Sequence, residues 1–456
     1  MTIRAFFAII LCKLLRGLSR FLHRGGTAMP GRAALKLCPN LLSILARQVR
    51  SVAITGTNGK TTSSRMVEEA FAEAGFSYFA NRSGANLIDG ITTEFVMNCT
   101  MTGKMRRDRA VIECDEAAAV KVFRQLRPEL IVVTNLFRDQ LDRYGEVTHT
   151  LENIRTAIRD VPEARFCLNA DCSLTASLAG DLPNPVIWYG IDPGAAPSRP
   201  KPEISDATHC IRCKTEYEYD YITYGHLGGF RCPKCGYRRH SADYAVTDVV
   251  EQRMDGSDIV MDIRGEKQLL TVNLPAMYNI YNAAGALCAA MEAGVDRETA
   301  VASLSRFSCG FGRMETFRLA GGARMMLVKN PAGCNQVLEY LENVHEPFIL
   351  AACLNDRGAD GTDISWIWDA DFEKLASLTG QLRQVIVSGD RAGDLRVRIK
   401  YAGIPDENIR VETDYEALIR SLEQESLPVF FMPTYTAMLE LRQTVIRHCG
   451  GADFWE

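Results

Sequence analysis

The sequence predicts an α/β fold in which parallel sheets are covered by helices. Short, unbroken apolar runs with strand character alternate with helical patterns in two separate stretches of the chain, as expected for parallel strands buried on both faces. A glycine-rich loop joins the first of these strands to a helix, and a cysteine-rich segment interrupts the first alternating stretch. The chain has 456 residues, which is enough for roughly two to four domains with separate cores.

The composition narrows the classes of protein to consider. Hydrophobic residues make up 47% of the chain and charged residues 24%, as in an ordinary globular protein. The formal net charge of −4 gives no general attraction to nucleic acid. Its 15 cysteines are scattered along a long chain, whereas a secreted disulfide framework concentrates cysteines in a short one. We therefore expect a cytoplasmic protein without a nucleic-acid partner.

Residues 1–50 are predicted to form an N-terminal helical segment. The apolar run Ala5–Cys12 is too short to span a bilayer, and basic side chains follow it over residues 13–24. A basic amphipathic helix of this kind either packs on its own domain, which we favour, or lies on an anionic membrane surface. A further helix is expected over residues 33–49.

A predicted phosphate-binding loop comes next. The strand pattern Ser51–Thr55 leads into a loop with two glycines, and a helical pattern over residues 63–74 follows. In such a loop, backbone N–H groups and the helix N-terminus bind phosphate oxygens, while Lys60 supplies a positive charge and Thr61 a hydroxyl ligand for Mg²⁺. The alternative is an ordinary strand-to-helix turn. The residues expected to bind a nucleoside triphosphate here are Gly56, Thr57, Asn58, Gly59, Lys60, Thr61 and Thr62.

Polar residues follow the next buried strands. Glu113 ends the strand pattern 109–114, and Asn135 directly follows the pattern 130–134, with Asp139 a few residues later. Because the carboxyl ends of parallel strands meet at one edge of a sheet, we expect these side chains near the phosphate loop. Glu113 is the candidate catalytic and magnesium-binding carboxylate, and a surface carboxylate is the alternative for this residue. Further strands are predicted at residues 76–80, 164–168 and 185–189.

A cysteine-rich insert is predicted at about residues 205–240. Cys210 and Cys213 form one Cys-x-x-Cys pair, and Cys232 and Cys235 form a second. Two such pairs can present four thiolates tetrahedrally to a structural Zn²⁺. Four free thiols are the alternative, and a nucleic-acid-binding zinc ribbon is disfavoured by nearby acidic residues.

The second alternating stretch predicts a smaller α/β domain at the C-terminal end. A helix is expected over residues 277–294, before this stretch begins. We place the central nucleotide-binding domain at residues 51–318 and the C-terminal domain at 319–456. The strands predicted for the C-terminal domain are residues 325–328, 348–352, 384–387 and 429–432.

Several motifs resemble those of the Mur ligase superfamily. Thr55–Thr62 is similar to the nucleotide loop of that family, including Ile54 in place of a first glycine. Leu168–Asp171, Tyr278–Ala283 and Phe311–Glu315 resemble its further ATP-domain motifs. The resemblance implies a Mur ligase-like central ATPase domain with an inserted four-cysteine zinc ribbon.

More narrowly, the chain resembles the MurT family, the synthetase subunits of lipid II isoglutaminyl synthase in bacterial cell-wall assembly. The four-cysteine insert supports this placement, as do the segments 139–146, 359–369 and 433–438. For the nucleotide, the resemblance implies that Asn279, Asn282 and Arg313 lie beside ATP. It also implies that Thr61 and Glu113 bind Mg²⁺, and that Asn330–Gly333 and Asn355–Arg357 contribute from the C-terminal domain.

The resemblance implies an ATP-dependent amidation. ATP would phosphorylate the α-carboxylate of D-glutamate in the lipid II stem peptide, and ammonia would convert the acyl phosphate to D-isoglutamine. The chain contains no G-x-C-x-G elbow for a glutaminase nucleophile, so the expected partner is a class I glutamine amidotransferase subunit of the GatD type, in a heterodimer. The competing interpretation is a Mur or folylpolyglutamate-type ligase that adds an amino acid.

A lipid-linked substrate is expected for a related reason. Muropeptide-adding ligases carry a full N-terminal domain for a UDP group, and only 50 residues precede the strand at Ser51. We therefore expect lipid II as the substrate, and this substrate would give the basic N-terminal helix a reason to lie at the inner face of the membrane, the alternative to packing on its own domain.

The resemblance also implies an aspartate that completes the partner's cysteine–histidine pair. The candidates lie in the stretch 356–369, and we favour Asp360 and Asp363, with Asp356 as a further catalytic candidate. For each, the alternative is a loop carboxylate that caps the following helix.

Overall fold

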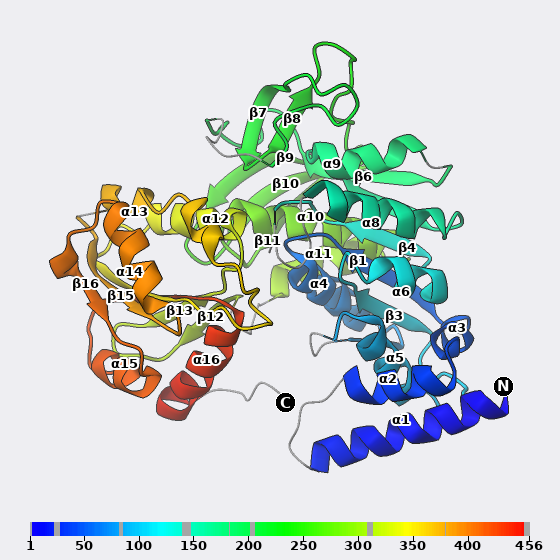
Figure 1. The fold of residues 1–456 in the computed structure, drawn as a ribbon. Coiled ribbons are helices and arrows are strands. Elements are labelled where there is room, and N and C mark those ends of the chain that lie inside the picture. The colour runs from blue at the N-terminus through cyan, green and yellow to red at the C-terminus, as the bar shows by residue number, and fades with distance from the viewer. Residues whose placement is uncertain are drawn as a thin grey trace.

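The architecture consists of two α/β units and a small hairpin that projects from the first of them (Figure 1). The structure is a computed structural model that describes residues 2–21, 28–81, 85–138, 147–181, 183–200, 206–307, 313–378 and 380–450. Within these residues the helices are α1 (Ile3–Phe21), α2 (Ala28–Leu37), α3 (Leu41–Ala46), α4 (Lys60–Glu73), α5 (Ile88–Met97), α6 (Ala119–Leu126), α8 (Val147–Arg159), α9 (Ser173–Ala176), α10 (Met277–Glu292), α11 (Arg297–Arg306), α12 (Pro331–Glu342), α13 (Lys374–Ser377), α14 (Ala392–Tyr401), α15 (Tyr415–Leu422) and α16 (Tyr435–Cys449).

The strands form three sheets. They are β1 (Arg50–Thr55), β2 (Tyr78–Ala80), β3 (Arg109–Glu113), β4 (Leu130–Val133), β5 (Arg165–Asn169), β6 (Val186–Ile191), β7 (Glu218–Tyr224), β8 (Leu227–Arg231), β9 (Tyr244–Gln252), β10 (Ser257–Ile263), β11 (Glu266–Val272), β12 (Arg313–Phe317), β13 (Ala323–Met326), β14 (Phe348–Cys353), β15 (Leu382–Ser388), β16 (Ile409–Val411) and β17 (Val429–Pro433).

The first sheet has nine strands in the order β11-β10-β9-β6-β5-β4-β1-β3-β2. Pairing is parallel from β2 through to β9 and antiparallel between β9, β10 and β11. In the register, Ile54 of β1 lies between Glu113 of β3 and Val132 of β4. The carboxyl ends of these three strands therefore meet at one edge, and the predicted parallel sheet is confirmed.

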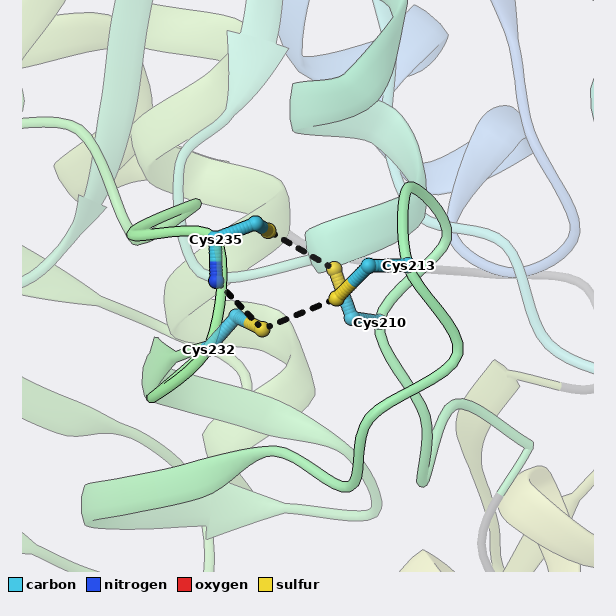
Figure 2. Close-up of side chains that lie close together, drawn as sticks. All are labelled: Cys210, Cys213, Cys232 and Cys235. Carbon is cyan, nitrogen blue, oxygen red and sulfur yellow. Dashed lines mark hydrogen bonds between the residues drawn. The ribbon is translucent and has the colours of Figure 1, made fainter.

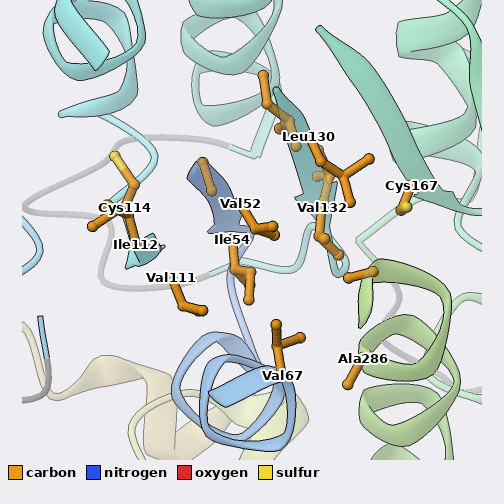
Figure 3. Close-up of a cluster of buried hydrophobic side chains, with 14 of the residues drawn as sticks. Val52, Ile54, Val67, Val111, Ile112, Cys114, Leu130, Val132, Cys167 and Ala286 are labelled. Atoms are coloured by element: carbon orange, nitrogen blue, oxygen red, sulfur yellow. The ribbon is translucent and has the colours of Figure 1, made fainter. Parts of the chain in front are cut away.

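Helices cover both faces of this sheet. Figure 3 shows the buried side chains of β1, β3 and β4, with Val67 of α4 and Ala286 of α10 below them and further helices above. Val52 and Ile54 point into this packing and are buried, as the unbroken apolar strand pattern predicted. The core holds β1 rigidly, and with it the start of the loop that follows β1.

The predicted helix over residues 33–49 is wrong, because this stretch contains parts of two helices, α2 and α3. Pro39 lies between them. It lacks an N–H donor, and its ring would clash with the carbonyl four residues earlier in a continuous helix. Pro30 lies in the first turn of α2, where the missing N–H costs no hydrogen bond.

The second sheet has six strands in the order β12-β13-β17-β14-β15-β16, parallel except for β12. Separate clusters of buried apolar side chains cover its two faces. The predicted C-terminal α/β domain is confirmed. Its limit at residue 319 stays a prediction, and β12, which begins at Arg313, already pairs within this second sheet.

Candidate nucleotide site and four-cysteine cluster

The loop after β1 has the backbone that phosphate binding requires. Gly56 and Gly59 have φ angles of 120° and 86°, a region that favours glycine. A Cβ atom on Gly59 would lie 2.0 Å from Oδ1 of Asn282, and one on Gly56 would lie 2.4 Å from Oγ1 of Thr134. The two glycines therefore let the loop run between the end of β4 and helix α10, and α4 begins directly after it at Lys60.

Lys60 is buried at the centre of this loop. Its Nζ donates hydrogen bonds to the carbonyl oxygen of Gly56 at 2.6 Å and to Oε1 of Glu116 at 2.9 Å. Burial alone would lower the pKa of Lys60, but Glu116, Glu113 and Asp115 outweigh burial and raise it. The ammonium is therefore charged at neutral pH and lies where a terminal phosphate would meet the loop.

The three acidic residues after β3 have different surroundings. Glu113 ends β3 and is half-buried, and its backbone N–H donates to Oδ1 of Asn81 at 2.9 Å. Oδ1 of Asp115 accepts from the backbone N–H of Ala117 at 3.0 Å, so this carboxylate supports the start of α6. Glu116 makes the direct contact with Lys60. Of these three residues only Glu113 was predicted to be a site residue, although Glu116 lies only three residues further on.

Asn58 links the loop to both α/β units. Its N–H donates to Oδ1 of Asn135 at 3.0 Å, and its carbonyl oxygen accepts from Oγ1 of Thr134 at 2.7 Å. From the second unit, Nδ2 of Asn330 donates to Oδ1 of Asn58 at 3.0 Å. Asn330 is also the N-cap of α12, where its Oδ1 accepts from the N–H of Gly333. The loop tip is therefore held both by the residues that follow β4 and by the second unit.

A pocket opens beside this loop, between the two units. Asn279 and Asn282, both predicted to lie beside the nucleotide, line it from α10, and Nδ2 of Asn282 donates to Oδ1 of Asn279 at 3.2 Å. Tyr224 also lines the pocket and comes from the cysteine-rich insert. The other residues around it are Asn58, Gly59, Thr62, Asn135, Leu274, Tyr278, Met314, Met326, Leu327, Lys329, Ala332, Gly333, Gln336 and Val337.

The composition of this pocket suits a nucleoside base and phosphates. Apolar and aromatic side chains gather beside a few amides and a lysine, which is the usual make-up of a small-molecule site. Lys329 was not predicted from the sequence, although it directly precedes Asn330. The side chain of Arg313 and the predicted segment 139–146 lie outside the described residues.

The cysteine-rich insert connects β6 to β9 and contains the hairpin β7–β8. Its four thiol groups lie within 4.8 Å of one another, and Figure 2 shows them converging from two loops. The Sγ atoms of Cys210 and Cys235 are 3.5 Å apart, and those of Cys213 and Cys232 are 3.4 Å apart. Four thiolates bound tetrahedrally at about 2.3 Å from one Zn²⁺ lie about 3.8 Å apart, so the cluster has the size of a zinc site.

The two loops that carry these cysteines share one backbone geometry. Lys214 and Gly236, each directly after a Cys-x-x-Cys pair, have φ angles of 62° and 73°. Each donates its N–H to the carbonyl oxygen of the first cysteine of its pair, at 2.8 Å and 3.1 Å. Four thiols that merely happened to be close would not require two matching turns.

The insert also contacts the phosphate loop through Phe137. The Phe137 ring lies 5.6 Å from the Tyr224 ring in a stacked arrangement and 4.5 Å from the His226 ring. The backbone N–H of Phe137 donates to Oγ1 of Thr57 at 3.1 Å, and the Thr57 hydroxyl donates back to its carbonyl oxygen. The hairpin therefore packs on the segment that holds Thr57 in place.

The aspartates predicted to serve a partner's active site differ in their surroundings. Asp360 is buried, and Oδ1 accepts from the N–H of Thr436 at 2.7 Å, close to the start of α16. Burial raises the pKa of Asp360, although its contacts with Thr436 oppose the change. Asp363 is half-buried and accepts from the N–H of Ser365 at 2.8 Å, while Asp356 lies 3.5 Å from the Arg391 guanidinium.

Two protein-family models match the chain. The Mur ligase middle domain matches residues 54–232, which include the phosphate loop and three of the four clustered cysteines. The MurT ligase C-terminal domain matches residues 327–438, which cover most of the second sheet.

Curated relatives align along almost the whole chain. The lipid II isoglutaminyl synthase (glutamine-hydrolyzing) subunit MurT of Streptococcus pneumoniae is 35% identical over 420 residues, which are 92% of this chain and 92% of that protein. The protein of the same name from Staphylococcus aureus is 33% identical over 453 residues, which are 98% of this chain and 99% of that protein.

Solved structures share the fold at low sequence identity. A pseudomurein peptide ligase type C from Methanothermus fervidus has a TM-score of 0.65 and 18% sequence identity. The superposition covers 88% of this chain and 79% of that protein. The MurF ligase from Thermotoga maritima in complex with ADP has a TM-score of 0.61 and 13% sequence identity. The superposition covers 91% of this chain and 85% of that protein. At these identities, the similarity establishes a common architecture.

Proposed function

This chain belongs to the MurT family of Mur ligase-type, ATP-dependent ligases, and from this premise we propose that it amidates the α-carboxylate of D-glutamate in the stem peptide of lipid II. The observation that carries the proposal is the near full-length similarity to subunits named for lipid II isoglutaminyl synthase. A phosphate loop held by residues of both α/β units supports it, because such a site can bring a nucleotide and an acceptor together.

The proposed reaction proceeds through an acyl phosphate. A bare carboxylate is a poor acyl donor, so a carboxylate oxygen first takes the terminal phosphoryl group of ATP and ADP is released. Ammonia then attacks the carbonyl carbon, the bond to the phosphate oxygen breaks, and loss of a proton from nitrogen leaves the amide. Lys60 and the N–H groups of Gly56–Thr62 stabilise the charge on the transferred phosphoryl group.

Thr61 and Glu113 are the residues that would hold Mg²⁺ beside the nucleotide. Thr61 lies in the first turn of α4, and Glu113 ends the strand next to β1, so both lie at the same edge of the sheet. A hydroxyl and a carboxylate are suitable oxygen donors for this ion, which neutralises phosphate charge when bound. Asn279, Asn282 and Arg313 are proposed to contact the nucleotide.

Ammonia is proposed to come from a second chain. The sequence lacks the cysteine elbow of a glutaminase, and the relatives are named as subunits of a glutamine-hydrolysing synthase. We therefore infer a heterodimer with a class I glutamine amidotransferase of the GatD type. Asp363 is the favoured residue to complete the partner's site, because Asp360 is buried and already bonded to Thr436.

The first test uses the chain with ammonium chloride in place of the partner. With lipid II, ATP and Mg²⁺, we expect ADP and amidated lipid II to form in equal amounts, and hydroxylamine to trap the acyl phosphate as a hydroxamate on D-glutamate. ADP formation that needs a free amino acid, with that amino acid added to the product, would contradict the proposal and favour an amino-acid-adding ligase.

A structural zinc site is also proposed for the four-cysteine cluster. Removing the metal is expected to lower the melting temperature and to weaken ATP binding by up to about 10²-fold, because Phe137 and Thr57 lose the support of the hairpin. Metal content and ATP affinity should be measured for Cys210→Ser and for Cys449→Ser, a matched control outside the cluster. Unchanged ATP affinity in a zinc-free Cys210→Ser protein would contradict this coupling.

A further inference from the structure

Helix α1 buries one face against its own domain. Ala5, Ala8, Ile9 and Cys12 are fully buried, and the helix packs against α2 and α5. Lys13 fixes the helix further, because its Nζ donates to the carbonyl oxygen of Cys99 at 2.5 Å. The buried face confirms part of the sequence-based interpretation, in which the helix packs on its own domain.

The opposite face of α1 is apolar and exposed. The exposed fractions of its large apolar side chains are 78% for Ile3, 56% for Phe7, 66% for Leu14, 54% for Leu18 and 82% for Phe21. With 3.6 residues per turn, these five side chains fall within an arc of about 60° along a helix about 28 Å long. They form a continuous strip, and apolar strips of this extent on a protein surface mark interaction sites.

The charge around this strip has one sign. The 19 residues of α1 include no acidic residue, and the exposed Arg4 lies on this helix next to the strip. An exposed apolar strip on a helix that carries only basic charges is the pattern of a helix that lies in the interface of an anionic bilayer.

The position of α1 fits a flat partner. Figure 1 shows α1 along the outer edge of the first unit, beyond α2 and α5. A helix packed along an edge, with its outer face exposed, can rest along a planar surface. In the part of the chain that the structure covers, no helix is long and apolar enough to cross a bilayer.

We propose that α1 binds the surface of an anionic membrane, with its apolar strip inserted at the boundary between headgroups and acyl chains. The exposed Arg4 guanidinium beside the strip contacts the lipid phosphates. This inference deepens the proposed function, because it names the surface that would hold the enzyme beside a lipid-linked substrate. Its evidence is the geometry of α1, and its test requires neither lipid II nor ATP.

The test is sedimentation of the full chain with vesicles of phosphatidylcholine that contain phosphatidylglycerol, compared with phosphatidylcholine alone. We expect binding to the anionic vesicles, weakened at least about tenfold by Leu14→Glu and separately by Phe7→Glu. Val397→Glu is the matched control, because Val397 is 47% exposed on α14, far along the chain, and its replacement should leave binding unchanged. Raising the salt concentration should also weaken binding.

Two results would overturn the proposal. One is equal affinity of the wild type and both α1 variants for anionic vesicles. The other is a stable dimer in solution that Leu14→Glu dissociates, since the strip would then be a contact between two copies. Amidation in detergent solution should persist in both variants, so a failure of vesicle binding is distinguishable from a failure of the proposed catalytic function.

Discussion

Replacing Lys60 by methionine is expected to lower ATP-dependent amidation by at least about 10²- to 10³-fold. The Lys60 ammonium is buried against the carbonyl oxygen of Gly56 and the Glu116 carboxylate, so no solvent cation can take its place. The loss should appear in turnover with glutamine and with ammonia alike, because both reactions need the same phosphoryl transfer. Steady-state ADP release measures the effect.

A second variant separates catalysis from stability. Lys60→Met leaves Glu116 buried without its cation, which costs about 3 to 5 kcal/mol when the carboxylate stays charged. The double variant Lys60→Met with Glu116→Gln removes that charge and is expected to regain most of the melting temperature, while amidation stays absent. Recovery of amidation in the double variant would show that Lys60 acts only through folding.

Asp363→Asn is expected to lower glutamine-dependent amidation by up to about 10⁴-fold, in the range seen when the aspartate of a catalytic triad is replaced. Ammonia-driven amidation by the same variant should be unchanged, because Asp363 is not among the residues that line the pocket and accepts a hydrogen bond within its own loop, from Ser365. The ratio of the glutamine-dependent rate to the ammonia-driven rate therefore reports on the partner's glutaminase site alone.

Asp360→Asn is the matched comparison. Asp360 accepts hydrogen bonds from the backbone N–H and the hydroxyl of Thr436 at the start of α16. Its replacement should therefore lower the free energy of unfolding by about 0.5 to 2 kcal/mol and change the glutamine-dependent and ammonia-driven rates equally. If Asp360→Asn abolishes only the glutamine-dependent reaction and Asp363→Asn does not, the assignment of the two residues is reversed.

Local patterns in the sequence predicted much of this architecture. The strands around β1 are apolar runs that the sheet buries on both faces, and the two Cys-x-x-Cys pairs meet as their spacing predicted. The two asparagines Asn279 and Asn282 line the pocket, and their contact with ATP stays a prediction. Short-range signals of this kind depend on a few neighbouring residues, and the sequence displays them directly.

Contacts between distant segments could not be predicted in the same way. Asn58 and Asn330 are 272 residues apart, and only the folded chain brings Asn330 to the tip of the phosphate loop. The stacking of Phe137 on Tyr224 likewise joins a loop of the first sheet to the insert. The sequence also could not predict that the α1 strip is exposed, because an amphipathic pattern does not show which face of a helix packs on the protein.

The central claim is amidation of lipid II by this chain together with a glutaminase subunit. The most direct measurement is mass spectrometry of the stem peptide after incubation with ATP, glutamine and both chains. We expect a D-glutamate residue lighter by the difference between a hydroxyl and an amino group, formed only when both chains and ATP are present and absent with Lys60→Met. A product that instead gains the mass of an amino acid would contradict the account.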